Sequence, residues 1–185
     1  MIEVEAKAKI NNLEEIKTNL KKLNAKKTKI EHQKDIYFNS PIVDFAKTDE
    51  ALRIRKTTTE NKSNIFITYK GPKIDAKSKT RKEIEMKIAD EKQCKEIFEN
   101  LQFKEVRTVK KHREYYQLNE YTINIDKVEG LDYYMEIETI VEDNSNYEKD
   151  LNGIFDLFNK LGIKNTFERK SYLELLEDKD SKNKK

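Results

Sequence analysis

Several short segments of this chain carry a charged residue at every second position, with mostly apolar residues between. In the first of them, residues 2–9, the charged residues Glu3, Glu5 and Lys7, followed by Lys9, alternate with apolar ones. Successive side chains of a β-strand point to opposite sides, so such a strand has one charged face and one apolar face. A sheet of these strands must place its charged faces either in solvent or around a polar interior.

The alternation recurs along most of the chain. Further strands are expected at residues 32–39, 51–56, 64–70, 80–88, around 111–115, at 121–128 and at 133–140. Half-exposed antiparallel strands also alternate polar and apolar residues, so a single segment is compatible with an ordinary sheet surface. The whole set is what favours a polar interior.

The charged faces place like charges side by side. Arg53 and Arg55 share one face of their strand, and Glu136 and Glu138 share one face of theirs. Residues two apart in a strand are separated by about 6–7 Å, and like charges at that spacing repel unless an ion of opposite sign compensates them. The acidic and basic pairs also lie on different strands. Together they predict one site that needs both signs of charge, with carboxylates for metal and Arg and Lys for phosphate.

Amphipathic helices are expected at residues 12–23, 91–101, 146–161 and 171–177, where apolar residues recur three and four positions apart. Asp90 is a good N-cap for the second of these. The helices need an apolar surface to cover, and the uncharged strand faces provide it. The expected class is therefore α+β, with helices packed outside a sheet whose charged side curls around a polar lumen.

Composition excludes several classes of protein. The 38 Lys and Arg residues nearly balance 35 Asp and Glu residues in a chain of 185, whereas general nucleic-acid binders carry a basic excess. No apolar run is long enough to span a membrane. The single cysteine, Cys94, excludes an intrachain disulfide and is expected in the core. We expect a cytoplasmic protein with neither a nucleic-acid nor a membrane partner.

Residues 1–177 are expected to form one domain. Residues 178–185 contain no apolar side chain and are expected to be a disordered charged tail. His32 and His112 have no partner at a ligand-like spacing, so structural or surface roles are expected for them.

The alternating motifs resemble a known family. Glu3-x-Glu5-x-Lys7 is similar to the E-x-E-x-K signature of the CYTH superfamily, the triphosphate tunnel metalloenzymes. Six further segments follow in order: Arg53-Ile-Arg55, Thr68-Tyr-Lys70-Gly71, Arg81-Lys-Glu83-Ile-Glu85, Lys111-His-Arg113, Ile125-Asp126-x-Val128-Glu-Gly130-Leu131 and Glu136-Ile-Glu138. Longer phrases at 48–55, 68–73, 128–131 and 169–176 resemble the class IV adenylyl cyclase branch, from which the chain departs at Val43, where an arginine is expected.

The resemblance implies an eight-stranded, mainly antiparallel β-barrel that forms a tunnel, with helices outside. It implies that four carboxylates bind Mg²⁺ or Mn²⁺: Glu3, Glu5, Glu136 and Glu138. The implied substrate-binding residues are Lys7, Arg53, Arg55, Lys70, Arg81, Lys111 and Arg113. Arg81, Glu83 and Glu85 are also expected to form lumen ion pairs that orient the other residues. The implied catalytic set is Glu3, Glu5, Lys7, Lys111, Arg113 and Asp126.

Three functions fit this resemblance. A class IV adenylyl cyclase that converts ATP to cyclic AMP and pyrophosphate leads, because the branch-like phrases are long. A triphosphatase acting on inorganic triphosphate, thiamine triphosphate or a nucleoside triphosphate is the alternative, and a non-enzymatic nucleotide or polyphosphate binder comes third. The expected partner is ATP or another triphosphate, and a homodimer stays an open alternative.

Overall fold

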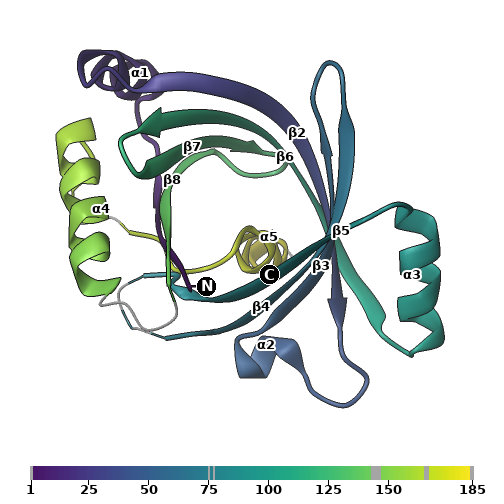
Figure 1. Ribbon diagram of the computed structural model, residues 1–185. Coiled ribbons are helices and arrows are strands. Elements are labelled where there is room, and N and C mark those ends of the chain that lie inside the picture. The colour runs from purple at the N-terminus through teal and green to yellow at the C-terminus, as the bar shows by residue number, and fades with distance from the viewer. Residues whose placement is uncertain (1, 75, 77, 143–146, 165–166, 184–185) are drawn as a thin grey trace.

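The structure is a computed structural model that describes residues 2–74, 76, 78–142, 147–164 and 167–183, without the side chain of Ile2. Within these residues, eight strands close into one barrel in the order β1-β5-β4-β3-β2-β6-β7-β8, and every neighbouring pair is antiparallel (Figure 1). The strands are β1 Ile2–Lys9, β2 Lys26–Asn39, β3 Ala51–Thr58, β4 Ser63–Lys73, β5 Arg81–Ile88, β6 Lys104–Leu118, β7 Tyr121–Val128 and β8 Tyr133–Val141. The expected barrel is confirmed.

Two strands are longer than their alternation predicts. β2 begins at Lys26 and β6 extends over 15 residues, because the two pair with each other along almost their whole length. The N-terminal half of β2 is mostly exposed and polar. Pairing with β6 satisfies its backbone groups without any apolar pattern.

Helices surround the barrel. They are α1 Leu13–Lys22, α2 Phe45–Thr48, α3 Glu91–Asn100, α4 Tyr147–Leu161 and α5 Tyr172–Asn183. In the view of Figure 1, α5 lies across the opening of the barrel, where Tyr172 lines the cavity. The Asp90 side chain caps α3 as expected, accepting a hydrogen bond from the backbone N–H of Gln93. The sequence pattern did not predict α2, which is only four residues long and has no buried residue. Asn146, the expected first residue of the helix that is α4 in the structure, lies outside the described residues.

The segment expected to be a disordered tail is helical as far as Asn183. Its last turns contact the barrel, since Arg107 on β6 forms an ion pair with Asp180 at 2.6 Å. Lys179 Nζ also donates to the carbonyl oxygen of Gly130 at 2.7 Å. These polar contacts replace the apolar ones that the segment lacks. Residues 184–185 lie outside the described part.

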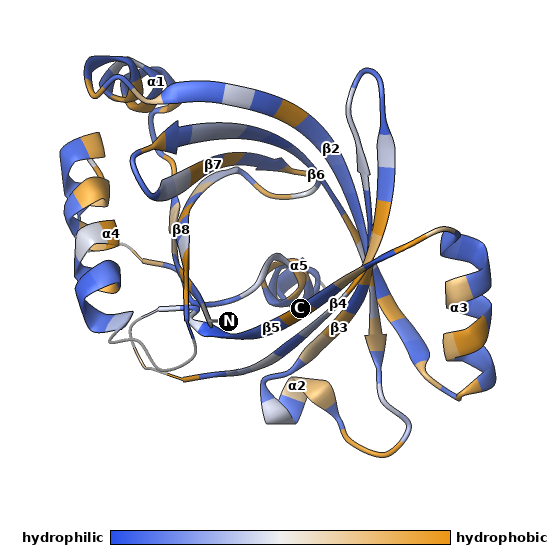
Figure 2. Cartoon of the chain, in the orientation of Figure 1, coloured by the Kyte–Doolittle hydropathy of each residue, from blue (hydrophilic) through white to orange (hydrophobic). Residues whose placement is uncertain are grey.

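The apolar strand faces form the core beneath the helices. α1 and α4 pack against β1, β7 and β8 around Ile123, Ile137, Ile154 and Phe158, all fully buried. α3 covers β2 and β3, and Cys94 lies in that cluster as expected. Hydrophilic and hydrophobic positions alternate along the strands (Figure 2). None of the described helices has the length and apolar character needed to cross a membrane.

Candidate functional site

The charged strand faces line one cavity inside the barrel, with a volume of about 430 Å³. Ten of the twelve side chains expected at the site line it: Glu3, Glu5, Arg53, Arg55, Lys70, Arg81, Lys111, Arg113, Glu136 and Glu138. The other two, Lys7 and Asp126, are almost completely buried behind its wall. The ten lining residues therefore converge on one lumen, and Lys7 and Asp126 do not line it.

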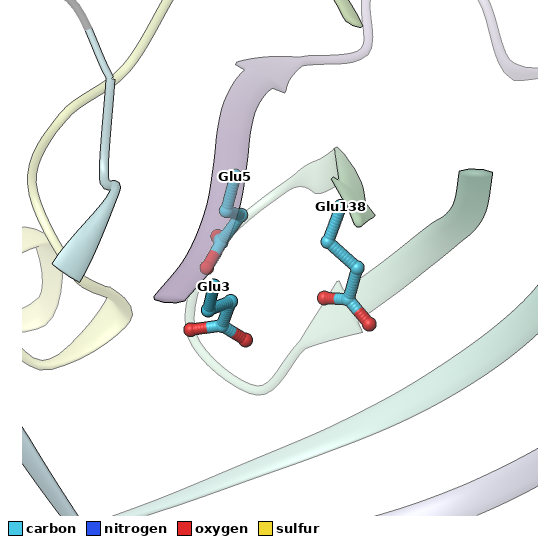
Figure 3. A group of neighbouring side chains, drawn as sticks. All are labelled: Glu3, Glu5 and Glu138. Atoms are coloured by element: carbon cyan, nitrogen blue, oxygen red, sulfur yellow. The ribbon is translucent and has the colours of Figure 1, made fainter. Parts of the chain in front are cut away.

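Three carboxylates gather at one wall of the cavity. Glu3 and Glu5 lie on β1, and Glu138 lies on β8 directly opposite Glu5 in the strand register. One carboxylate oxygen from each lies within 4.8 Å of those from the other two, and Figure 3 shows the three side chains around a common space. Carboxylate oxygens in such a group suit a hard divalent cation such as Mg²⁺ or Mn²⁺.

The charges of this acidic group are incompletely compensated. Burial and the nearby Glu3 raise the pKa of Glu138 to about 7. Burial and then Glu136 raise the pKa of Glu5 as well. Both shifts mean that the carboxylates resist ionisation where they lie. A bound cation would remove that penalty, so the residues present fit a divalent metal ion.

Glu136 lies apart from this group of three. It is bound by Arg113 and by Lys79, whose Nζ is 2.9 Å from its carboxylate. Burial alone would raise the pKa of Glu136, but these cations hold it well below its usual range. Of the four expected metal ligands, the structure therefore brings three together and engages the fourth in ion pairs.

Lys79 is a central residue that the sequence pattern did not predict. Its Nζ donates to Glu5 and Glu136, and its backbone N–H donates to the carbonyl oxygen of Glu5 at 2.9 Å. Lys79 precedes β5 and has no strand pattern of its own. Its position in the sequence could have indicated its role. Lys79 lies two residues before Arg81, so it continues the alternation of Arg81 and Glu83 toward the N-terminus.

Two arginines are fixed by aspartates directly opposite them on neighbouring strands. Arg55 donates to both oxygens of Asp35 at 2.6 Å, across the β2–β3 pair. Arg113 likewise contacts both oxygens of Asp126 across the β6–β7 pair, with one N–O distance of 2.6 Å. Asp35 was not among the expected site residues. Bidentate pairs of this kind fix the orientation of each guanidinium group.

Asp126 serves as the buried anchor of several groups. Lys111 Nζ lies 3.3 Å from it, and the hydroxyl of Tyr172 on α5 donates to it at 2.8 Å. It is fully buried behind the cavity wall. Asp126 does not line the lumen. It positions Lys111 and Arg113 from behind the cavity wall.

The remaining cations lie nearer the seam between β1 and β5. Lys70 contacts Glu3 at 2.6 Å and Glu83 at 2.5 Å. Arg81, opposite Glu3 in the register, has a weaker contact of 3.4 Å from a guanidinium nitrogen to the carbonyl oxygen of Gly71. Of the expected lumen ion pairs in this region, Glu83 forms pairs with Lys70 and Arg53, while Glu85 accepts a hydrogen bond from Thr68.

The cationic wall has capacity for an anion. Burial and Arg113 lower the pKa of Lys111 to about 8, and burial followed by Lys79 lowers the pKa of Lys7 to about 7. An anion near these lysines would restore their charge. Within the described residues, the buried Nε of Arg53 also has no hydrogen-bond partner. The lumen therefore combines crowded cations, an unsatisfied donor and a carboxylate group.

Replacing Lys79 tests its role as the internal counter-ion. Burial alone would lower the pKa of Lys79, but Glu136 and Glu5 raise it above its usual range, so the lysine is charged. Lys79→Met should lower the unfolding free energy of the metal-free protein by about 3–5 kcal/mol, because it removes the ion-pair partner of the buried Glu5 and one of the two cationic partners of Glu136. Denaturant unfolding measures this. Lys110→Met, which breaks an exposed pair with Glu129, is the control, and equal effects of the two changes would contradict the assignment.

Comparisons with known proteins agree with this geometry. The family model described as CYTH domain matches residues 1–172. A Methanocaldococcus jannaschii protein named "Putative adenylate cyclase MJ0240" is 47% identical over 176 residues, covering 95% of this chain and 98% of that one. Among solved structures, the PH1819 protein of Pyrococcus horikoshii has a TM-score of 0.90 and 43% identity, covering 96% of this chain and 99% of that one.

A more distant neighbour has the same fold. This solved structure is described as "Putative adenylyl cyclase HpAC1 from Hippeastrum reveals a dominant triphophatase activity". It matches with a TM-score of 0.67 and 17% identity. The match covers 96% of this chain and 95% of that one. The family match over most of the chain and the close relatives agree with the two-sign lumen, and the chain belongs to the CYTH family.

Proposed function

We propose that this protein is a metal-dependent enzyme that converts ATP to cyclic AMP and pyrophosphate. The observation that carries the proposal is the juxtaposition, in one lumen, of the Glu3, Glu5 and Glu138 carboxylates with a cationic wall. The similarity to proteins named as adenylate cyclases supports it. A site that only bound polyphosphate would need the cations but not the three clustered carboxylates.

In this proposal the carboxylates and the cations that line the cavity have different roles. Glu3, Glu5 and Glu138 would hold Mg²⁺ or Mn²⁺, with Glu136 positioned nearby by Lys79 and Arg113. When bound, the metal supplies Lewis-acid activation of the attacking oxygen and neutralises phosphate charge. Arg53, Arg55 and Lys70 line the same cavity and would bind phosphate oxygens.

Lys111 and Arg113 would stabilise the charge that develops on the leaving pyrophosphate. They would act as the ribose 3′-hydroxyl loses its proton to water and its oxygen bonds to the α-phosphorus. The bond between the α-phosphorus and the oxygen that bridges to the β-phosphate breaks in the same step, and that oxygen leaves with the pyrophosphate. Asp126 would keep both cations in place through the contacts described above. Lys7, with its pKa near 7, would gain full charge when the polyanion binds.

A triphosphatase is the second candidate. The same carboxylates and cations would serve a water molecule that attacks the γ-phosphorus, so the chemistry of the lumen suits both reactions. The Hippeastrum protein is described as having a dominant triphosphatase activity, and its fold is the same, which supports this second candidate.

Product analysis separates the two candidates. The purified protein would be incubated with ATP, inorganic triphosphate and thiamine triphosphate, each with Mg²⁺ or Mn²⁺. We expect cyclic AMP and pyrophosphate in equal amounts from ATP. Release of inorganic phosphate from any of the three substrates, without cyclic AMP, would contradict the cyclase and support the triphosphatase. Absence of both products would contradict an enzymatic function.

Metal affinity should depend on pH in a defined direction. The pKa of Glu138 is raised from 4.5 to about 7, so the metal-free folded protein keeps a proton that a metal must displace. The stabilisation from this proton is lost as pH rises through about 7. Mn²⁺ affinity, measured by calorimetry, should therefore rise with pH up to about pH 7, where Glu138 loses its proton, and then level off. Glu138→Gln should flatten the curve, and a flat wild-type curve would contradict the site.

Glu5→Gln separates catalysis from folding. The raised pKa of Glu5 means that its ionised form is disfavoured in the fold, so the metal-free variant should be as stable as wild type or slightly more stable. Turnover should fall by about two or more orders of magnitude. Melting curves and turnover are measured on the same samples, with the exposed Glu129→Gln as control. Normal turnover in Glu5→Gln would remove the metal mechanism.

A further inference from the structure

A second hollow lies on the outer side of the barrel, where β3, β2, β6 and β7 run side by side. Its volume is about 600 Å³, and α3 packs on the same sheet beyond it, against Ile36 and Ile54. Lysines and histidines on the outer strand faces line this space. We name it the outer basic hollow and define it by six of these residues: His32, Lys34, Lys56, Lys110, His112 and Lys127.

The strand register arranges these residues in two rows across the sheet. One row holds His32, His112 and Lys127, and the other holds Lys56, Lys34 and Lys110, each residue directly opposite the next. Side chains directly opposite on one face have Cβ atoms about 4.5–5.5 Å apart, and like charges in such positions destabilise a sheet. The second row places three lysines in this unfavourable arrangement.

The positive charge of these rows is poorly compensated. Lys34 is paired with Glu91 at 2.7 Å. Within the part of the chain that the structure describes, neither Lys56 nor Lys127 has an ion-pair partner. Both side chains are exposed, so their charges can turn toward a ligand in the hollow. An anion lying on the rows would relieve the repulsion between the lysines.

The two histidines lie in this positive field. Their ring centroids are 5.0 Å apart. Burial and then His32 hold the pKa of His112 below its usual range; Lys27 and Lys127 act in the same direction, and Glu114 opposes them. Two imidazoles can bind a transition metal, but the surrounding lysines would repel a cation. An anion would be attracted, and a protonated imidazole would donate a hydrogen bond to it.

Carboxylates limit the extent of the positive field. Among the described residues that line the hollow, Glu129 is the one with a carboxylate, and it lies 3.6 Å from Lys110. Glu114 is the next outward-facing residue of β6 after His112, and Glu91 lies on the side of α3. A long nucleic-acid strand would meet these carboxylates beyond the hollow. A compact anion would contact only the cations.

We propose that the outer basic hollow binds a short oligophosphate, either inorganic or carried by a nucleotide. Its terminal oxygens would accept charge-assisted hydrogen bonds from the lysines of one row and from the imidazoles of the other. The proposal is independent of the reaction assigned to the lumen, because none of the six residues lines the lumen cavity.

Histidine NMR signals test the proposal at this place alone. The chain has two histidines, and both lie in the hollow. Inorganic triphosphate and ATP are titrated separately into the protein in metal-free buffer. Each should shift both imidazole signals and move the pKa of His112 upward, toward its usual range, because a nearby anion favours the charged form. Signals that stay unchanged with inorganic triphosphate would overturn the proposal. A shift with ATP alone would also contradict it, because the phosphates would then not be the recognised group.

A double variant tests which lysines bind the anion. Lys56→Gln/Lys110→Gln should weaken triphosphate binding in the histidine titration by about tenfold or more, because it removes two charged donors. Turnover at the lumen should stay at the wild-type value. Lys21→Gln/Lys22→Gln, which changes two exposed lysines in the last turn of α1, is the matched control and should keep the wild-type affinity.

The outcomes separate this proposal from the proposed function. Wild-type affinity in Lys56→Gln/Lys110→Gln, or an equal loss in the control variant, would overturn the outer site. A parallel loss of turnover in Lys56→Gln/Lys110→Gln would contradict its independence from the lumen. Failure of the wild type to form any product would contradict the enzyme, whereas the histidine shifts would still support the outer site.

Discussion

The pairing of buried charges across neighbouring strands is the constraint on which this barrel depends. Charged side chains inside a fold are costly unless each has a partner, and the strand register supplies partners directly, as with Arg113 opposite Asp126 and Lys70 opposite Glu83. Each pair also fixes the direction of a cationic group that lines the cavity. The same ion pairs that stabilise the charged lumen in the fold would therefore also orient its cations for the proposed triphosphate.

The alternation of residues made much of this architecture predictable. Period-two patterns identified eight strands and placed Glu3, Arg53 and Glu138 on lumen faces, because a side chain's face follows from its parity along a strand. Their convergence also required the barrel to close, which the family resemblance supplied. Parity does not show which carboxylates meet, however. Glu136 and Glu138 share a face, yet only Glu138 joins Glu3 and Glu5, while Glu136 forms ion pairs with Arg113 and Lys79.

What the sequence could not show was set by contacts between distant segments. Lys79 precedes its strand, and its role appears only when the loop packs beside Glu5. His32 and His112, 80 positions apart in number, are opposite each other on β2 and β6 with ring centroids 5.0 Å apart. The final turns of α5 form without apolar residues because Asp180 and Lys179 reach the barrel. In each case a tertiary contact overrides a weak local pattern.

The seam between β1 and β5 is where the fold and the proposed chemistry meet. Among the described residues, two pairs join these strands, so the ion pairs that cross nearby, Lys70 with Glu3 and Lys79 with Glu5, supplement a short hydrogen-bonded contact. Glu3 and Glu5 are also two of the three carboxylates proposed to hold the metal. A cation bound there would compete with Lys70 and Lys79 for the same oxygens. Metal binding would therefore replace the ion pairs of Glu3 and Glu5, and would leave Lys70 with Glu83 and Lys79 with Glu136 as their remaining carboxylate partners.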